Sequence, residues 1–466
     1  MRLRIAAQGK RLRFQRSQDI ARSRGAYYAS ICGLLCIVAL LQLALWPAVI
    51  AAKGGLGPYV RITTDFLPTL MGGQIIRDGR GDHLYDREAQ REALRQLVSP
   101  YLTTHGDTMN IYNHPPAEAL LAALLSNLPA EVIFWIWTAL AMLAFGASLS
   151  ILAWASPLPR PILWIAVLAS ASYHPVHLSW WLGQNTTFVL LGVCCLYAGR
   201  RRRHDGLAAI GLALLILKPQ LLPAVGILLL LERRWRMIAI ATAILSGLTV
   251  TAIPILGVAW PVRYARYLLI DSNQGQVVAE KPMVMHNWRG FAVNLLDHRA
   301  PTLVTLTFVV LSIFSLGLLL FAWWSTRQTP AAYQNTTRSE RDDLLFALSC
   351  VSTLLISVHL NPHDLTLLIV PAWIVSGYLV AKRWAVVIVR IWTAIIWIGY
   401  ALPFPTYYTT ATEVLPVVSS VSLMALVTVL LAWQAIKPSV NTDSSNEAAI
   451  PNEDRGQLTI GIRFER

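Results

Sequence analysis

The chain has 466 residues, of which 55% are hydrophobic and only 14% are charged, a balance too apolar for a soluble protein of this length. Apolar runs of about 16 to 24 residues recur, near the length that a helix needs to cross a hydrocarbon core of about 30 Å. The roughly ten-residue alternating strands typical of a transmembrane β-barrel are absent from the sequence. We therefore expect an all-α, polytopic membrane protein.

The charge pattern argues against a nucleic-acid partner. The net charge is +14, but the basic residues form short tracts that flank apolar runs, as in cytoplasmic loops of membrane proteins. The five cysteines all lie inside apolar runs, which is typical of small buried side chains and not of a disulfide framework or a metal site.

Residues 1–27 hold eight Lys or Arg side chains and one acidic side chain, which predicts a cytoplasmic N-terminal segment. The next apolar run, about 28–52, is long and lacks a small-residue cleavage site, so we expect a retained first helix and not a removed signal peptide. The following segment, 53–129, then becomes a long first extracytoplasmic loop.

This loop carries an acid, Asp65, about a dozen residues beyond the first helix, and so just above the bilayer surface. Its glycines mark turns, and residues 86–98 show the periodicity of an amphipathic helix. The paired prolines of Tyr112–Pro116 break the backbone before a short apolar run. We expect the active site to form around Asp65.

Further helices are expected, in chain order, at about 130–154, 160–181, 186–199, 237–258, 303–324, 344–359, 365–380, 385–402 and 414–436. Basic residues at alternate ends keep one side cytoplasmic, and 259–302 becomes a second long extracytoplasmic loop. The transmembrane domain thus covers 28–436 with about 11–13 transmembrane or re-entrant helices. The polar tail, 437–466, reads as disordered and cytoplasmic.

The segment 206–231 is basic at both ends and contains Lys218-Pro219-Gln220 in its middle. A charge at the bilayer centre costs about 2.5–3.5 kcal/mol on insertion scales. Proline-broken backbone at that depth is tolerated where protein or a water-filled cavity surrounds it. We therefore expect two short helices whose apex reaches an outward-facing cavity while both ends stay cytoplasmic.

This topology collects chemically active side chains on the extracytoplasmic side. The candidate catalytic residue is Asp65, and the candidate substrate-binding residues are His114, Gln184, Asn185, Lys218, Gln220, His286 and His363.

Each candidate also has a structural alternative. Asp65 is compatible with an N-cap of the following helix, and His114 with a place at the membrane interface. The position of Lys218 also fits a side chain that snorkels to the lipid headgroups. The positions of His363 and Asp364 also fit a cap of a helix that starts at Leu365. Three further acids are predicted to be turn and cap residues and not catalysts: Asp78, Asp82 and Asp86.

An acid, a lysine and histidines around an outer cavity suit transfer of a sugar from a lipid-linked phosphate. The carboxylate deprotonates an acceptor hydroxyl, and cations stabilise the departing phosphate. The sequence contains no GxxxxGKS loop, no GxGxxG after a strand and no metal-ligand cluster, which disfavours a nucleotide-dependent enzyme. We expect no cofactor and a metal-independent reaction.

Five motifs in order resemble glycosyltransferase family 87, over about residues 28–435. They are Asp65–Thr69 with Gly81–Asp86; Tyr112–Pro116; Gly183–Asn185; Leu217–Gln220 with Arg233–Arg236; and Asn361–Asp364. The resemblance implies a GT-C-type fold and a membrane enzyme that uses polyprenyl-phosphate mannose. The expected location is the bacterial plasma (inner) membrane.

The resemblance implies that Asp65 is the general base of an inverting transfer. It places Lys218 and His363 near the donor phosphate or sugar, and Gln184 near the cavity. Two departures from the family pattern, Leu67–Thr69 in place of an aromatic pair and a single late histidine followed by Asp364, leave the donor sugar open. Mannose is the family default.

Other functions stay open at this point: a polyprenyl-phosphate pentose or glucose transferase, a sugar-lipid flippase or transporter, and a scaffolding membrane protein. A flippase would need the outer cavity but not Asp65 as a base. The expected partners are a polyprenyl-phosphate sugar donor, membrane lipids, and a glycolipid, cell-wall polymer or exopolysaccharide acceptor, with no nucleic acid.

Overall fold

The computed structural model describes residues 2–99, 112–156, 158–269, 282–296, 300–328, 334–382, 386–388, 390–392, 394–395 and 414–436. Within these ranges the chain is almost entirely helical and contains no strand. The expected helix at 385–402 lies largely outside the described residues, and the expected tail, 437–466, lies entirely outside them.

The helices are α1 (Arg2–Ala52), α2 (Leu56–Pro58), α3 (Leu67–Arg77), α4 (Arg87–Val98), α5 (Ala117–Leu124), α6 (Ala130–Ala155), α7 (Arg160–Ala171), α8 (His174–Trp181), α9 (Thr186–Arg202), α10 (Asp205–Leu214), α11 (Pro223–Leu231), α12 (Trp235–Leu256), α13 (Trp260–Leu269), α14 (Trp288–Leu296), α15 (Pro301–Arg327), α16 (Gln334–Ile356), α17 (Ile369–Ala381) and α19 (Val414–Ile436). A π-helical segment, Tyr59–Thr63, precedes α3, and short 3₁₀ segments include Leu215–Leu217, Pro219–Leu221 and Pro362–Leu368.

Five helical segments in the described ranges are long and apolar enough to cross a membrane: Ala26–Ala52, Ala130–Ala155, Trp235–Leu256, Pro301–Arg327 and Pro362–Ala381. The helix expected at 160–181 is two helices, α7 and α8, bent by 40°, which together make a sixth candidate span. The segments expected at 186–199 and 206–231 fold as shorter helices. The protein is an all-α, polytopic membrane protein.

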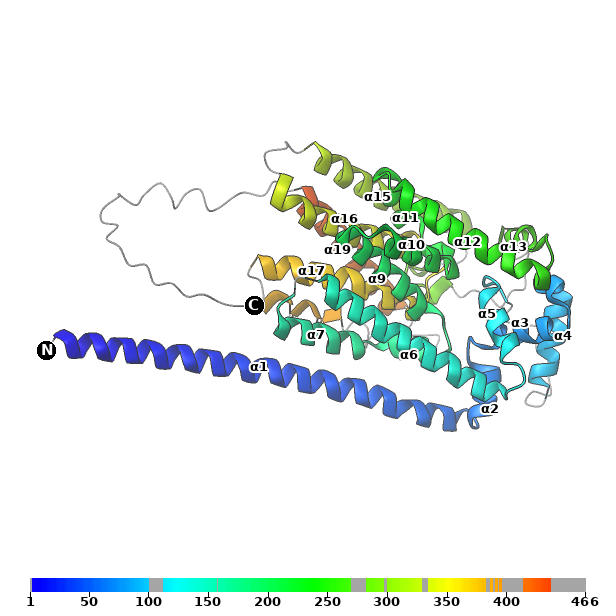
Figure 1. Ribbon diagram of the computed structural model, residues 1–466, viewed down its shortest axis with the longest axis horizontal. Coiled ribbons are helices and arrows are strands. Elements are labelled where there is room, and N and C mark those ends of the chain that lie inside the picture. Colours follow the sequence, from blue (N-terminus) through cyan, green and yellow to red (C-terminus); the bar gives the residue numbers. More distant parts are fainter. Residues whose placement is uncertain are drawn as a thin grey trace.

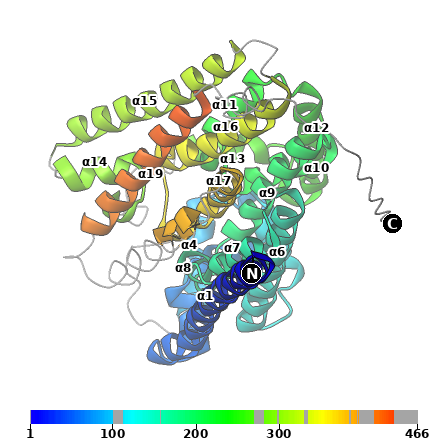
Figure 2. The ribbon, with the colours of Figure 1, turned by 90° about the vertical axis from the view of Figure 1, so that its left-hand side faces the viewer.

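The helices form an elongated bundle with two distinct ends (Figure 1). At one end, α3, α4 and α5 cover the bundle; we call this the site end. At the other, which we call the basic end, Arg200 pairs with Glu232 and Arg201 pairs with Asp343. Viewed along the bundle, α1 lies at its edge beside α6 and α7, far from α15 (Figure 2).

The segment expected to break at Lys218 does so, which confirms that prediction. α10 ends at Leu214, two 3₁₀ turns flank Lys218, and α11 begins at Pro223. The Lys218 backbone is non-helical, with φ −138° and ψ 76°. The far ends of α10 and α11 both lie at the basic end, because Glu232, directly after α11, pairs with Arg200 at the end of α9.

The expected first extracytoplasmic loop is itself folded. Residues of α3, α4 and α5 form a second apolar cluster with α12 and α13, separate from the main core. Asp86 caps α4 by accepting hydrogen bonds from the backbone N–H groups of Glu88 and Ala89, as its position before the amphipathic pattern predicts. Ala89 and Ala93 turn the apolar face of α4 inward.

Glycines let α9 and α10 pack closely. A Cβ atom on Gly211 would meet the Gly192 carbonyl oxygen and the Leu196 backbone nitrogen. A Cβ atom on Gly192 would lie 2.9 Å from that of Leu214. Because backbone cannot move aside as a side chain can, these two positions fix how near α10 approaches α9, and therefore where the break at Lys218 lies.

We expect Gly211→Ala to destabilise the protein by about 1–3 kcal/mol, because the added methyl group overpacks a backbone contact. The matched control is Gly247→Ala in α12, where a Cβ atom would meet nothing within 4 Å. That substitution should be neutral or stabilise by up to about 1 kcal/mol. Unfolding free energies in detergent measure both, and equal effects at the two positions would contradict the close-packing account.

Candidate active site

Asp65 lies where the π-helical segment gives way to α3. The N-cap of α3 is Phe66, and no side chain caps it, so Asp65 is not the helix cap. Instead, Gln184 Nε2 donates a hydrogen bond to Asp65 Oδ2 over 2.7 Å. Phe66 anchors this stretch by packing edge-on against Phe134 of α6.

The turn between α8 and α9 carries Gln184 to this acid. Gly183 has φ +67°, in the left-handed region that favours glycine, and a Cβ atom there would lie 2.7 Å from that of Phe66. A larger residue would push the turn away from the stretch that holds Asp65. Glycine is therefore required for the contact between Asp65 and Gln184.

Lys218 lies buried in the break between α10 and α11, at 6% exposure. Its ammonium donates to Gln184 Oε1 at 3.2 Å, to Thr186 Oγ1 at 2.9 Å and to Asp364 Oδ1 at 2.5 Å. A lysine ammonium has three N–H donors, and all three are used. Lys218 is a fixed interior cation and does not snorkel to headgroups.

Asp364 joins the late loop to this network. Its Oδ1 accepts from Thr186 Oγ1 at 3.1 Å as well as from Lys218, and its Oδ2 accepts from the Asn361 backbone N–H at 3.1 Å. His363 Nε2 lies 3.5 Å from the same carboxylate. Asp364 thus takes part in the cap of the 3₁₀ segment Pro362–Leu368, whose N-cap is Asn361, and also serves as the counter-ion of Lys218. The expected helix start at Leu365 and the capping role of His363 are wrong.

A second buried acid, Glu118 in the first turn of α5, holds the other side of the site. His114 Nδ1 lies 2.8 Å from Glu118 Oε2, and Asn185 Nδ2 donates to Glu118 Oε1 over 2.5 Å. Thr69 Oγ1 donates to Oε2 over 3.3 Å. The adjacent residues Gln184 and Asn185 therefore tie two different acids of the first loop to the start of α9.

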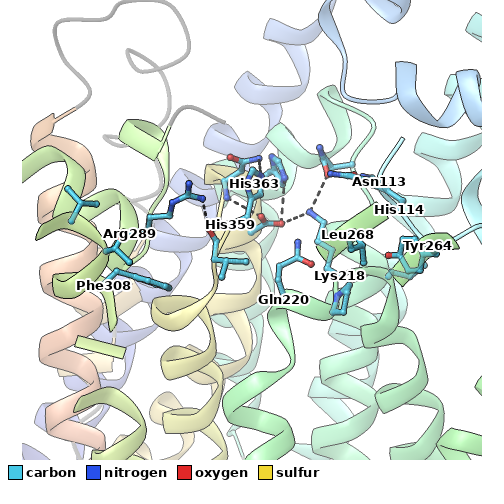
Figure 3. A pocket seen from close by; sticks show the side chains of 18 residues that line it. Asn113, His114, Lys218, Gln220, Tyr264, Leu268, Arg289, Phe308, His359 and His363 are labelled. Carbon is cyan, nitrogen blue, oxygen red and sulfur yellow. Dashed lines mark hydrogen bonds and ion pairs between the residues drawn. The ribbon is translucent and has the colours of Figure 1, made fainter. Parts of the chain in front are cut away.

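A cavity of about 600 Å³ lies at the site end of the bundle. In Figure 3, His359 and Arg289 lie on one side, His114 and Tyr264 lie on the other, and Lys218 is between them. The cavity is lined by Asn113, His114, Gln184, Leu217, Lys218, Pro219, Gln220, Tyr264, Leu268, Arg289, Val304, Thr305, Phe308, Val358, His359, Asn361, His363 and Asp364.

The structure brings together most of the residues singled out from the sequence. His114, Gln184, Lys218, Gln220 and His363 line the cavity, and Asp65 adjoins it through Gln184.

Two candidate binding residues lie elsewhere. Asn185 is buried behind the cavity wall, where it binds Glu118. His286 is fully buried, and its Nδ1 lies 2.7 Å from Ser420 Oγ of α19. Burial lowers the pKa of His286 to about 4, so this ring is neutral. The structure gives both residues a packing role and does not bring either to the cavity.

Sequence reasoning missed several residues of the site. Glu118 is a lone acid one helical turn after His114, at the start of an apolar run, and that spacing was the available signal. His359 and Arg289 line the cavity, but nothing in the sequence separates them from ordinary loop residues.

The surroundings act on the two loop acids in opposite directions. Burial raises the pKa of Asp65 above its ordinary value, although the hydrogen bond from Gln184 and the charge of Lys218 act to lower it. Burial also acts to raise the pKa of Glu118, but the His114 and Asn185 contacts outweigh it and leave that pKa lowered. The pKa of Asp65 is thus raised, whereas that of Glu118 is lowered and Glu118 stays ionised.

Within the part of the chain that the structure describes, no group of three or more His, Cys, Asp or Glu side chains could hold a metal ion. Asp65 and Asp364 each bind a protein donor instead of facing one another as a ligand pair. The expectations of metal independence and of no cofactor stay predictions.

A comparison with protein families finds a match for this chain. The family model of glycosyltransferase family 87 matches residues 112–357, which is more than half of the chain. The matched range contains Gln184, Lys218 and His114, while Asp65 precedes it. The chain belongs to glycosyltransferase family 87 and is a membrane glycosyltransferase. Searches of curated proteins and of solved structures gave no match.

We expect Lys218→Met to destabilise the protein by about 3–5 kcal/mol, because it leaves Asp364 buried without its cation. The double variant Lys218→Met/Asp364→Asn should recover much of that loss, since no unpaired charge remains. Lys382→Met is the control: its pair with Glu340, at 3.7 Å, is exposed and should be worth about 0–1 kcal/mol. Unfolding free energies in detergent measure the three variants. A double variant less stable than Lys218→Met would contradict the pairing.

Proposed function

We propose that this chain moves a hexose from a polyprenyl-phosphate donor to a glycolipid or envelope glycan acceptor by inverting displacement, with Asp65 as the general base. The observation that carries the proposal is the fixed geometry of that acid. Gln184 bridges Asp65 and Lys218, and thereby holds a carboxylate of raised pKa beside a cavity of substrate size. Mannose is the donor sugar that the family resemblance favours.

The cavity suits an amphiphilic donor because one part of its wall is apolar and another part is polar. Leu268, Val304 and Phe308 give it apolar surface, whereas Lys218, Gln220 and the histidines give it polar surface. Val304 and Phe308 belong to α15, whose other face exposes Leu306 and Val310 to the surroundings of the bundle. A polyprenyl chain can therefore leave the cavity along α15 and remain in the bilayer while its sugar phosphate stays inside.

The reaction uses Asp65 as a proton acceptor. The acceptor hydroxyl oxygen attacks the anomeric carbon of the donor sugar, and its proton passes to Asp65. The bond between that carbon and the phosphate oxygen breaks, and the electron pair leaves with the polyprenyl phosphate. General-base catalysis of this kind contributes typically 10²–10⁴-fold to a rate.

Lys218 acts in this proposal by holding the site together. Its three donors are all used by protein acceptors, so a direct bond to substrate would cost it one of them. Its positive charge still faces the cavity and favours a departing phosphate over distance. His363 touches the same carboxylate and lines the wall next to it.

The proposed location is the bacterial plasma membrane, with the N-terminus in the cytoplasm and the site on the extracytoplasmic face. The arrangement of charge supports this orientation. The Arg200–Arg203 tract and Lys382 lie at the basic end, opposite the cavity, as expected for a cytoplasmic surface.

We expect Asp65→Asn to lower sugar transfer about 10²–10⁴-fold, because an amide cannot accept the acceptor proton. Transfer from radiolabelled polyprenyl-phosphate mannose to endogenous lipids is measured in membranes that hold equal amounts of wild type or variant. Polyprenyl-linked glucose and pentose donors run in parallel and identify the sugar. Undiminished product in the variant would contradict the assignment of Asp65, and a flippase would tolerate the change.

The pH dependence of transfer provides a second test. A general base acts when deprotonated, so activity should fall as the pH drops through the pKa of Asp65. Because that pKa is raised, the acid limb of kcat/KM should lie above the value of about 3.9 for an ordinary aspartate. Gln184→Leu removes a hydrogen bond that lowers the pKa, and should move the limb to still higher pH. A limb that moves downward in this variant would contradict the account.

A further inference from the structure

His114 and Glu118 form a buried-acid and histidine pair that the reaction described above does not use. Glu118 is only 3% exposed and accepts hydrogen bonds on both oxygens. His114 lies at the cavity wall with its side chain 21% exposed. In such a pair, the acid behind the histidine sets the orientation of the ring and determines which ring nitrogen carries a proton.

The geometry leaves one ring nitrogen for the cavity. Glu118 stays ionised and accepts from His114 Nδ1 at 2.8 Å, so Nδ1 carries a proton. Among the described residues, His114 Nε2 has no hydrogen-bond partner, although the residue lines the cavity. When the ring carries a proton on both nitrogens, Nε2 is a hydrogen-bond donor that faces the cavity.

Several other nitrogen groups at the cavity wall are already engaged. Within the described part of the chain, His363 Nδ1 has no hydrogen-bond partner, but the acid beside that ring, Asp364, is already paired with Lys218. Lys218 gives its three donors to protein acceptors, and His359 Nε2 lies 3.0 Å from Asn361 Nδ2. Arg289 lies on the opposite side of the cavity, where it donates to the Val358 carbonyl oxygen at 3.3 Å. Of these groups, His114 combines a ring nitrogen that faces the cavity with a buried acid of its own that orients the ring.

We propose that Glu118 is a positioning residue that orients the His114 ring, and that this ring, protonated on both nitrogens beside the bound phosphate, donates a hydrogen bond from Nε2 to the phosphate of the lipid-linked donor. This inference rests on the proposed function and adds the phosphate-binding group to it. A charge-assisted hydrogen bond at this atom selects a phosphate over a hydroxyl of the same lipid.

The test compares two ligands that differ only in that group. Binding of polyprenyl phosphate and of polyprenol is measured on purified, full-length protein in detergent. Wild type should bind polyprenyl phosphate at least about tenfold more tightly than polyprenol. A tenfold difference in affinity corresponds to about 1.4 kcal/mol, which one charged hydrogen bond can supply. His114→Asn and Glu118→Gln should each remove most of this preference and leave polyprenol binding unchanged. The double variant should lose no more than either single variant.

Glu131→Gln is the matched control. It removes an acid at the same end of the bundle, paired with Arg61 at 2.8 Å, whose partners do not line the cavity. This variant should keep the phosphate preference. If Glu118→Gln does not accumulate, Glu118→Asp tests the same point, since the shorter side chain withdraws the carboxylate from Nδ1. An excess of phosphatidic acid should not compete, which separates the polyprenyl donor from a membrane phospholipid with the same headgroup.

Three results would overturn the proposal. The first is a wild type without phosphate preference, and the second is a preference that Arg289→Gln abolishes while His114→Asn does not. The third is a Glu118→Gln variant that binds both lipids equally less well, which would mean a structural role alone. Sugar transfer is measured separately, so that loss of transfer with an intact preference counts against the proposed reaction and not against this site.

Discussion

The constraint on which this structure depends is the neutralisation of one buried lysine, Lys218. Lys218 interrupts the apolar segment 206–231, and its ammonium needs three acceptors. Gln184, Thr186 and Asp364 supply them from the start of α9 and from the late 3₁₀ segment. Three parts of the chain that are far apart in sequence must therefore converge at one depth of the bundle, and the cavity lies at their meeting point.

The segment 53–129 completes the site because its acids bind the residues that precede α9. Gln184 reaches Asp65, and its neighbour Asn185 reaches Glu118, so both loop acids are held by one helix start. This arrangement explains why helices near the site are short: α8 and α10 end, and α9 and α11 begin, where the chain turns to present polar groups. Irregular backbone at such a depth is tolerated because it lines a cavity.

Much of the fold could be predicted from the sequence, and there are physical reasons why the other features could not. Helix positions followed from hydrophobic runs, and the break at Lys218 followed from a charge beside a proline. The bend between α7 and α8 was missed because hydropathy is continuous across it. Glu118 was missed because its role depends on contacts with His114 and Asn185, and the sequence signals it only by its spacing from His114. The position of His286 away from the cavity could not be predicted, because a buried histidine and a site histidine look alike in sequence.

The central claim is that Asp65 accepts a proton in a single displacement and never bonds to the sugar. The stereochemistry of the product tests it most directly. A polyprenyl-phosphate sugar of defined anomeric configuration is supplied, and the configuration of the glycosidic bond formed is determined by NMR. The account predicts inversion, because the acceptor attacks opposite the departing phosphate. Retention would contradict it, since two displacements require a covalent intermediate on an enzyme nucleophile.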